Sequence, residues 1–161
     1  MRKACERPDD ERLSTWVSLL EAHAVLMDKL ERELTAAGGP PLAFYDVMVQ
    51  LQDAPDHRLT MKQLADAVLL SKSGVTRLVD RMMAAGYVTR DSCATDRRVV
   101  YAKLTSKGLN AFKKAMPKHL GDIERSFSRH LTDTEARTLR NVFEKLLEAA
   151  RSDDLHGAAT G

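Results

Sequence analysis

Polar and basic side chains recur at helical spacing between Ser71 and Gly86 and form one side of a predicted helix, opposite a row of apolar residues. Hydroxyl groups near the start of a helix, followed one turn later by arginine, suit insertion into the major groove of DNA. The hydroxyls and first-turn amides contact phosphate, and arginine reads a guanine edge with two hydrogen bonds. This polar side comprises Ser73, Thr76, Arg77, Asp80 and Arg81, with Lys72 in the first turn.

The charge of the chain is concentrated around this helix. The 161 residues carry a net charge of only +2, but the segment from Ser71 to Lys103 has seven basic and three acidic side chains, a local net charge of +4. Arg97 and Arg98 lie at the tip of a predicted hairpin, where they could reach a minor groove or its flanking phosphates. The charge distribution, rather than the total, therefore indicates a nucleic-acid partner.

The elements around the polar helix are typical of a winged helix-turn-helix. Thr60 and Gln63 form a predicted capping box for a short helix, Ser71 caps the polar helix and Gly86 ends it. The pattern then becomes alternating, which predicts two strands, 87–91 and 98–104, joined as a hairpin. The apolar side of the polar helix is Val75, Leu78, Val79 and Met82, and the helix before Pro55 presents Phe44, Val47, Met48 and Leu51.

Long amphipathic helices flank this predicted winged helix-turn-helix. The first is predicted from Leu13 to Leu34 and ends at Gly38–Gly39, another begins after Thr105, and the last follows a capping box at Thr132–Glu135. We expect Pro117 to kink or interrupt the second of them. One small domain cannot cover this much apolar surface, so we expect a second copy to pack on it. The apolar positions are Leu13, Trp16, Leu20, His23, Met27, Leu30 and Leu34; then Leu109, Phe112, Met116, Leu120, Ile123 and Phe127; then Leu139, Val142, Phe143, Leu146 and Ala150.

The predicted fold is mainly α with a small β-hairpin wing, a winged helix-turn-helix with long dimerisation helices. We expect the winged helix-turn-helix to span residues 40–104 and the helical dimerisation region to combine residues 11–39 and 105–151. Residues 1–10 and 152–161 are charged or rich in small polar side chains and are predicted to be flexible tails.

Other classes of protein find little support in the sequence. Cys5 and Cys93 fit neither a disulfide framework nor a zinc site, and the five histidines lack metal-ligand spacing. We find no phosphate-binding glycine loop and no nucleophile elbow, which argues against an enzyme, a metal or a cofactor. No apolar run reaches the roughly 20 residues needed to span a bilayer. We therefore expect a cytoplasmic protein without a membrane partner.

Several of these segments resemble the MarR (multiple antibiotic resistance regulator) family over about residues 13–150. The resemblance is strongest from the wing into the following helix. The matching segments are Leu64-Ala65-Asp66-Ala67, Ser71-Lys72-Ser73-Gly74-Val75-Thr76-Arg77-Leu78-Val79-Asp80-Arg81-Met82, Gly86-Tyr87-Val88-Thr89-Arg90 and Asp96-Arg97-Arg98-Val99-Val100-Tyr101-Ala102-Lys103-Leu104-Thr105-Ser106-Lys107-Gly108.

The resemblance implies a homodimeric transcriptional regulator, a repressor, on a pseudo-palindromic operator. The helix at 71–85 would enter the major groove, with the wing at 92–98 in the minor groove. In the family the wing acid, here Asp96, pairs with an arginine of the reader helix, for which Arg81 is the candidate. Arg98 would serve the wing fold or a phosphate. The residues that the resemblance places on DNA are Ser71, Lys72, Ser73, Thr76, Arg77, Arg97 and Arg98.

The resemblance also implies release by a small aromatic or phenolic effector. Trp16, His23, Asp46 and Arg90 are candidates for lining its pocket, although His23 also fits a dimer interface. Some family members sense oxidants through a reactive cysteine, so a redox regulator that uses Cys5 or Cys93 is one alternative. A winged helix used for protein contact is another; it would predict an apolar or acidic reader face.

Overall fold

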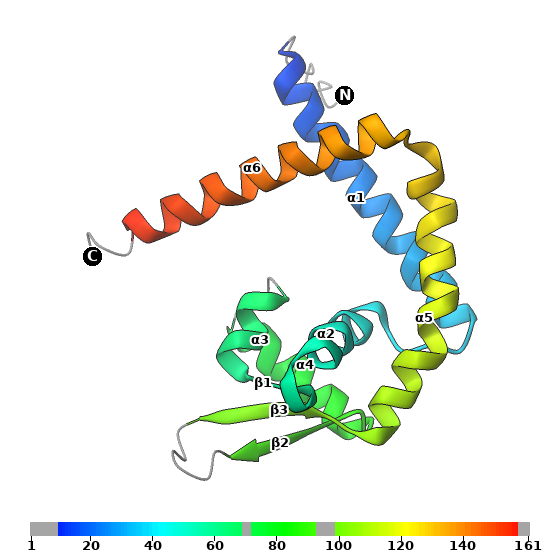
Figure 1. Ribbon diagram of the computed structural model, residues 1–161, viewed down its shortest axis with the longest axis vertical. Helices are drawn as coiled ribbons and strands as arrows, with labels where there is room; N and C mark the ends of the chain where they lie inside the picture. Colours follow the sequence, from blue (N-terminus) through cyan, green and yellow to red (C-terminus); the bar gives the residue numbers. More distant parts are fainter. Residues whose placement is uncertain (1–9, 69–71, 93–98, 158–161) are drawn as a thin grey trace, which may run out of the picture. The chain divides into compact units, whose positions relative to one another are not determined.

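The structure, a computed structural model, describes residues 10–68, 72–92 and 99–157. It forms two units, residues 1–122 and residues 123–161, and α5 begins in the first and ends in the second. The second unit also holds the 3-10 turn η2 (Ser128–His130) and α6 (Asp133–Gly157). The first unit contains, in chain order, α1 (Glu11–Ala36), α2 (Leu42–Asp53), the 3-10 turn η1 (Pro55–His57), β1 (Arg58–Thr60), α3 (Met61–Ala67), α4 (Lys72–Ala84), β2 (Val88–Ser92), β3 (Val100–Leu104) and most of α5 (Ser106–Ser126) (Figure 1).

The helix starts follow the capping signals in the sequence. The Thr60 hydroxyl accepts a hydrogen bond from the Gln63 amide at 3.1 Å, and the Gln63 side chain accepts one from the Thr60 amide at 2.9 Å. Thr132 and Glu135 repeat this arrangement at the start of α6, and Thr105 accepts from the Gly108 amide at the start of α5. The predicted capping boxes are therefore confirmed. The start of α2 is capped from α1, because the Glu31 carboxylate accepts from the Leu42 amide at 2.8 Å.

The wing is part of a three-stranded antiparallel sheet in the order β1-β3-β2. Strands β2 and β3 pair with Val88 opposite Leu104 and Arg90 opposite Ala102, which confirms the predicted hairpin. The edge strand β1 was missed, because its three residues are too few to show an alternating pattern; it pairs Leu59 with Ala102.

The core of the first unit lies where α2, α3 and α4 meet the inner face of this sheet. Every residue predicted for the apolar sides of α2 and α4 is buried. The C-terminal end of α1 also reaches this core, since Leu34 is fully buried and Met27 and Leu30 pack against it. The buried side chains of α2 and α4 include Phe44, Val47, Met48, Leu51, Val75, Leu78, Val79 and Met82.

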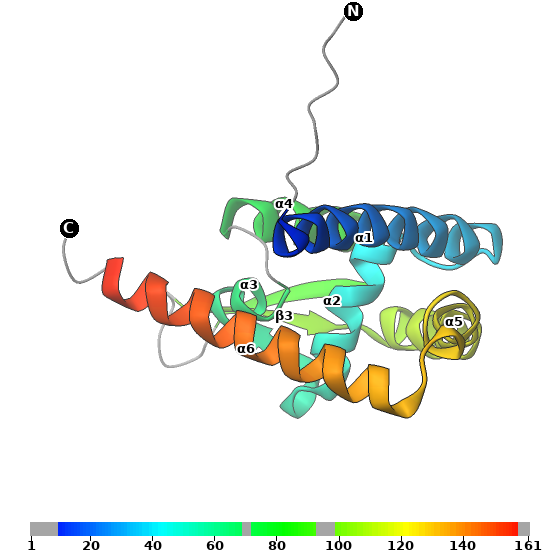
Figure 2. The same ribbon diagram turned by 90° about the horizontal axis from the view of Figure 1, so that it is seen from above.

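Other apolar residues of the long helices are exposed. Leu13, Trp16 and Leu20 lie on the N-terminal half of α1, which Figure 2 shows as one extended helix. The apolar stripe of α6, which we expect to pack on a second copy, is exposed within the single chain: Val142 and Leu146 are 46% and 53% exposed. In the described part of the second unit, α6 is accompanied only by η2 and the last turn of α5, which leave this stripe exposed.

Two boundaries differ from the prediction. Pro117 does not interrupt α5, which continues to Ser126. Pro117 leaves the carbonyl of Lys113 without its helical donor, but both residues are on the exposed side of α5, where water can satisfy that carbonyl. At the other end of the chain α6 extends to Gly157, so residues 152–157 are helical rather than part of a tail, and Asp10 caps α1. The division into dimerisation and winged-helix regions stays a prediction.

Candidate nucleic-acid interface

Helix α4 has one buried and one exposed side, as predicted. Val75, Val79 and Met82 are at most 1% exposed and fix the helix on the core, so its other side faces outward. That exposed side carries the side chains expected from the sequence, Ser73, Thr76, Arg77, Asp80 and Arg81.

The charged side chains on this face differ in their partners. The Asp80 carboxylate forms an ion pair with Arg90 of β2 at 2.7 Å. The Arg81 guanidinium lies over the Phe44 ring, 5.3 Å from its centroid. Arg77 has neither an ion pair nor a hydrogen bond with any residue that the structure describes. Among the described residues, Arg90 therefore neutralises Asp80, whereas Arg77 and Arg81 keep their N–H donors for a ligand, and Arg77 also lacks a ring contact.

The end of α4 is joined rigidly to β2. Gly86, with φ of +76°, donates its amide to the Met83 carbonyl, and the Tyr87 amide donates to the Met82 carbonyl, both at 2.9 Å. These two bonds form a Schellman motif, in which the residue at Gly86 must adopt the left-handed conformation that glycine tolerates best. The predicted role of Gly86 is confirmed.

The start of α5 packs against the junction between α4 and β2. The Thr105 hydroxyl donates to the Gly86 carbonyl at 2.8 Å, and Lys107 Nζ donates to the Ala85 carbonyl at 2.7 Å. A Cβ atom on Gly108 would lie 2.2 Å from the Tyr87 carbonyl oxygen, so only glycine permits this approach. The reader helix, the first wing strand and α5 therefore meet at one tightly packed point.

Several predicted site residues lie outside the described part of the chain. They include Ser71, Asp96, Arg97 and Arg98, and the side chain of Lys72. The Asp96–Arg81 pair therefore stays a prediction. Cys5 and Cys93, the candidates for a redox sensor, also fall outside, and so does the wing tip.

The Asp80–Arg90 pair was missed in the sequence, where Arg90 was assigned to the effector pocket instead. The sequence nevertheless indicated which face of β2 Arg90 occupies. Residues two apart in a strand share a face, and Val88 is an apolar residue at the start of β2, so Arg90 had to lie on the inner face toward α4. The structure has Arg90 donating to the Thr76 carbonyl at 3.4 Å in addition to its ion pair with Asp80.

The other residues predicted for the effector pocket have different surroundings. Trp16 is 57% exposed and His23 is exposed, both on α1. Asp46 on α2 lines a shallow cavity with Val49 and Gln50. Its pKa is raised by burial and by the nearby Glu31, and His119 opposes that shift. Arg90 and Asp46 therefore interact with separate sets of neighbours.

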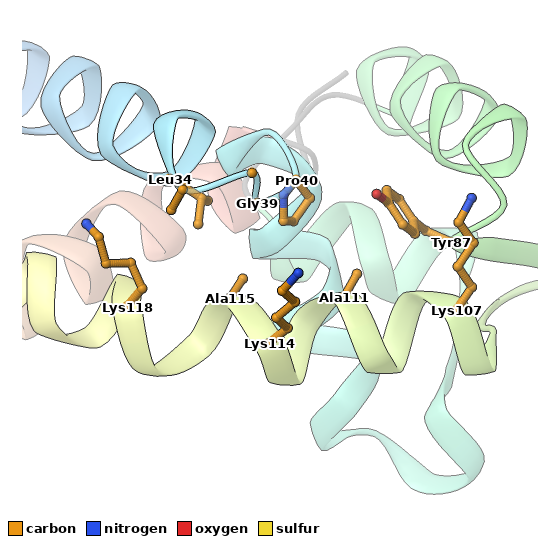
Figure 3. Close-up of a pocket in the computed structure, with 11 residues that line it drawn as sticks. Leu34, Gly39, Pro40, Tyr87, Lys107, Ala111, Lys114, Ala115 and Lys118 are labelled. Carbon is orange, nitrogen blue, oxygen red and sulfur yellow. The ribbon is translucent and has the colours of Figure 1, made fainter.

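A cavity of about 260 Å³ lies between the end of α1 and α5. Lys107, Lys114 and Lys118 extend from α5 toward it, and Tyr87 closes one end (Figure 3). Lys107 is bonded to the Ala85 carbonyl and Lys118 to two carboxylates, whereas Lys114 has no partner among the described residues. The remaining lining is largely apolar, with Leu34, Pro40, Ala111 and Ala115.

The comparisons with known proteins agree with this geometry. Residues 39–99, which span α2 to the wing, match the family model described as "MarR family". A solved structure of AbsC, a MarR family transcriptional regulator from Streptomyces coelicolor, superimposes with a TM-score of 0.83 at 30% sequence identity, covering 89% of this chain and 96% of AbsC. The chain belongs to the MarR family.

Two further relatives carry functional descriptions. Sco3205, a MarR family transcriptional regulator from Streptomyces coelicolor solved in complex with DNA, matches with a TM-score of 0.80 at 29% identity over 84% of each chain. The transcriptional repressor MprA of Escherichia coli strain K12 is 25% identical over 76% of this chain and 68% of MprA. MarR-family proteins are DNA-binding transcriptional regulators, a class distinct from enzymes, and the winged-helix fold predicted from the sequence is confirmed.

A buried polar cluster in this MarR-family chain was not predicted. Asp122 is fully buried and accepts two hydrogen bonds from Lys118, at 2.6 and 2.7 Å; Lys118 also pairs with Glu33 of α1 at 3.2 Å. His119 is 5% exposed, its ring centroid is 4.5 Å from that of Tyr45, and its Nδ1 has no hydrogen-bond partner among the residues that the structure describes. Burial lowers the pKa of His119, although Asp46 and Asp122 act in the opposite direction. Of the apolar stripe predicted for α5, Phe112 is buried and Leu109 packs against the core, whereas Met116 and Leu120 are 37% and 55% exposed.

In the described ranges, no group of three or more His, Cys, Asp or Glu side chains is placed to hold a metal ion. Across residues 10–68, 72–92 and 99–157, no helix has the length and apolar character needed to cross a bilayer.

Proposed function

We propose that the protein is a homodimeric, sequence-specific repressor that binds a pseudo-palindromic operator and is released by a small-molecule effector. The observation that carries the proposal is Arg77, a guanidinium with no ion pair or hydrogen bond to any described residue, on the exposed side of a helix whose other side is fixed in the core. An arginine held in this way can form two hydrogen bonds with a guanine edge. The names of Sco3205, solved with DNA, and of the repressor MprA support the same function.

In this proposal α4 enters the major groove and the wing at 92–98 reaches the adjacent minor groove. Ser73 and Thr76 contact phosphate or base edges beside Arg77, and the predicted contacts at Ser71, Lys72, Arg97 and Arg98 complete the surface. Two reader helices, one from each subunit, would lie about 34–36 Å apart, one turn of the duplex. A palindromic operator requires this pairing, because one helix alone reads half a site.

The exposed apolar side chains support the dimer. Among the described residues, all of the large exposed hydrophobic side chains except Met83 belong to α1, α5, α6 or the turn after α5. In the second unit an apolar groove of about 340 Å³, lined by Phe127, Leu139, Phe143 and Leu147, remains open. Contiguous apolar surface of this kind is typical of protein interfaces, and two-fold dimers are the commonest closed assembly.

The cavity beside Lys114 supports an anionic effector. Three lysines around an apolar lining fit a small aromatic or phenolic acid, whose carboxylate pairs with Lys114 and whose ring contacts Ala111 and Ala115. Tyr87 lines the cavity and follows Gly86, the Schellman glycine at the end of α4. A ligand in the cavity would therefore contact the junction between α4 and β2 and could shift α4. This cavity fits the effector better than the predicted set of Trp16, His23, Asp46 and Arg90.

The DNA proposal is tested by substituting Arg77. An operator is first selected from a genomic fragment library, and affinity is then measured by gel shift at about 50 and about 200 mM salt, over which a DNA reader with several phosphate contacts loses roughly a thousandfold. Arg77→Ala should cost about 1–3 kcal/mol on the operator. Lys113→Ala, which removes the same charge from an exposed site on α5, is the matched control. Equal affinities for Arg77→Ala and the control would refute the assignment.

The effector proposal is tested by thermal shift with a panel of hydroxybenzoates. The wild-type protein should be stabilised and Lys114→Gln should not, whereas Lys113→Gln should behave as wild type. A panel that stabilises none of the three proteins, or all of them equally, would remove the support for this cavity.

A further inference from the structure

Arg90 spans one full turn of the reader helix. One nitrogen of its guanidinium contacts the Asp80 carboxylate at 2.7 Å and another donates to the Thr76 carbonyl at 3.4 Å. Thr76 and Asp80 are four residues apart, so the arginine fork grips the helix at two successive positions of the same face. The contact ties a wing strand to the part of α4 that carries Arg77.

The strand that carries Arg90 is anchored in the core, so the contact can hold α4 in place. Val88, two residues earlier on the same face, is 2% exposed and packs in the core. Arg90 is the next inner-face residue, opposite Ala102 of the central strand β3. The side chain therefore links α4 to a strand that β3 holds along one edge and that the core holds on its inner face.

The negative charge of Asp80 opposes DNA binding on this face, so its presence there calls for another role, which the contact with Arg90 supplies. A carboxylate three residues from Arg77 would repel phosphates, and its removal should strengthen general attraction to DNA. The pair is only partly screened from water, since the side chains of Asp80 and Arg90 are 54% and 29% exposed, so it contributes little to the stability of the fold. Orientation of the helix is the effect that remains.

We propose that Asp80 and Arg90 are positioning residues that clamp the reader helix to the wing and thereby set operator specificity. This inference rests on the proposed DNA-binding role of α4. It assigns the specificity of the interface in part to two side chains that pair with each other, and it gives Arg90 a role other than effector binding.

The test compares Asp80→Asn with a matched control, Asp56→Asn. Asp56 pairs with Arg58 at 3.5 Å on the edge strand of the same sheet, away from α4, and its left-handed φ of 53° is one that asparagine also adopts readily. Both substitutions raise the net charge by one. Affinity is measured for the selected operator and for a scrambled duplex of the same length, at the same salt concentration.

Asp80→Asn is expected to change the affinities for the two duplexes differently. Asp80→Asn should bind the operator about fivefold more weakly, near the largest effect that a half-exposed ion pair produces, and the scrambled duplex as tightly as wild type or more tightly. Asp56→Asn should leave their ratio unchanged. Arg90→Gln should also lower the ratio, whereas Arg58→Gln, with the same loss of charge, should not. Arg90→Lys, which keeps the charge but not the fork, should fall between wild type and Arg90→Gln.

Three results would overturn the clamp. Asp80→Asn could bind the operator as tightly as wild type. The loss of operator affinity in Asp80→Asn could depend on one base pair of the operator and be absent in Arg90→Gln. Asp80 would then contact that base pair directly. The specificity ratio could also fall only in parallel with the melting temperature, which is measured for every variant and would indicate a fold defect. Since Arg77→Ala is tested on the same operator, a normal affinity in that variant would refute the proposed function separately.

Discussion

Helices α4 and α6 are both amphipathic, but the structure covers the apolar side of only one of them. In α4, Val75, Val79 and Met82 are at most 1% exposed, because α2, α3 and the sheet surround them within the same unit. In α6, Val142 and Leu146 are about half exposed. An apolar stripe can therefore serve two purposes: in α4 it fixes the helix so that its polar side can be presented, and in α6 it remains available for a partner.

The largest effect on stability is expected at two neighbouring methionines of α4, one on its buried side and one on its exposed side. Met82 is fully buried and Met83 is 38% exposed. Met82→Ala should lower the free energy of unfolding by about 2–5 kcal/mol, the range for large-to-small changes in a core, whereas Met83→Ala should cost under about 1 kcal/mol. Urea denaturation at one fixed protein concentration measures both. Similar losses in the two variants would mean that α4 is not fixed by its inner side.

The corresponding change in α6 should affect assembly rather than folding. Leu146→Glu places a charge in the exposed apolar stripe, so it should weaken dimerisation by at least about tenfold, or 1.4 kcal/mol, and leave the circular dichroism spectrum of the folded chain intact. Sedimentation equilibrium measures the monomer–dimer constant. Lys145→Gln changes the charge by the same amount next to this position and should dimerise normally. A Leu146→Glu protein that dimerises like wild type would exclude this stripe from the interface.

The same contrast explains what the sequence could predict. Periodicity and capping residues were sufficient for the helices, the two capping boxes and the Schellman glycine, because these signals are local. Periodicity identifies an apolar side but not what covers it, so it could not distinguish the buried stripe of α4 from the exposed Val142 and Leu146 of α6. The side chains of α4 were assigned correctly because the short neighbouring elements leave one place for them to pack.

Contacts between polar groups distant in sequence were not predictable in this way. Arg90 and Asp80 face each other only because β2 and α4 are joined at Gly86 and pack face to face. His119 and Asp122 were missed because such polar side chains are usually exposed, yet both are buried in the fold, where the His119 ring packs on Tyr45. Strand β1 depended on a pairing partner more than 40 residues away. Each of these features requires the tertiary structure.

The buried His119 makes the stability of the first unit depend on pH. Burial holds its pKa below the ordinary value of 6.5, so the unfolded chain binds a proton more readily than the folded one. As the pH falls below about 6.5, the free energy of unfolding should therefore decrease by at most about 1.4 kcal/mol per pH unit, until the pKa of the folded state is reached. The carboxylates of Asp46 and Asp122 reduce the effect without reversing it.

This dependence is measured by urea denaturation between about pH 7.5 and pH 5.5 at fixed protein concentration. His119→Gln should flatten the profile over this range, whereas His130→Gln, at an exposed site, should keep the wild-type slope. A profile unchanged by His119→Gln would mean that His119 titrates alike in the folded and unfolded chains. No comparable dependence is expected from α6, whose apolar stripe holds no buried titratable group among the described residues.

The smallest effect is expected at the start of α3, the helix that braces α4. Thr60→Ala removes the hydroxyl that accepts from the Gln63 amide and should cost about 1 kcal/mol, as for other N-caps. Thr60→Ser keeps the acceptor and should restore most of the loss. Because α3 packs on α4 through Leu64, fraying of its first turn should lower stability and loosen the reader helix together, so operator affinity should fall slightly while dimerisation is unchanged. A Thr60→Ala protein with altered dimerisation and normal DNA affinity would contradict the separation between a helix fixed for DNA and a helix left for a partner.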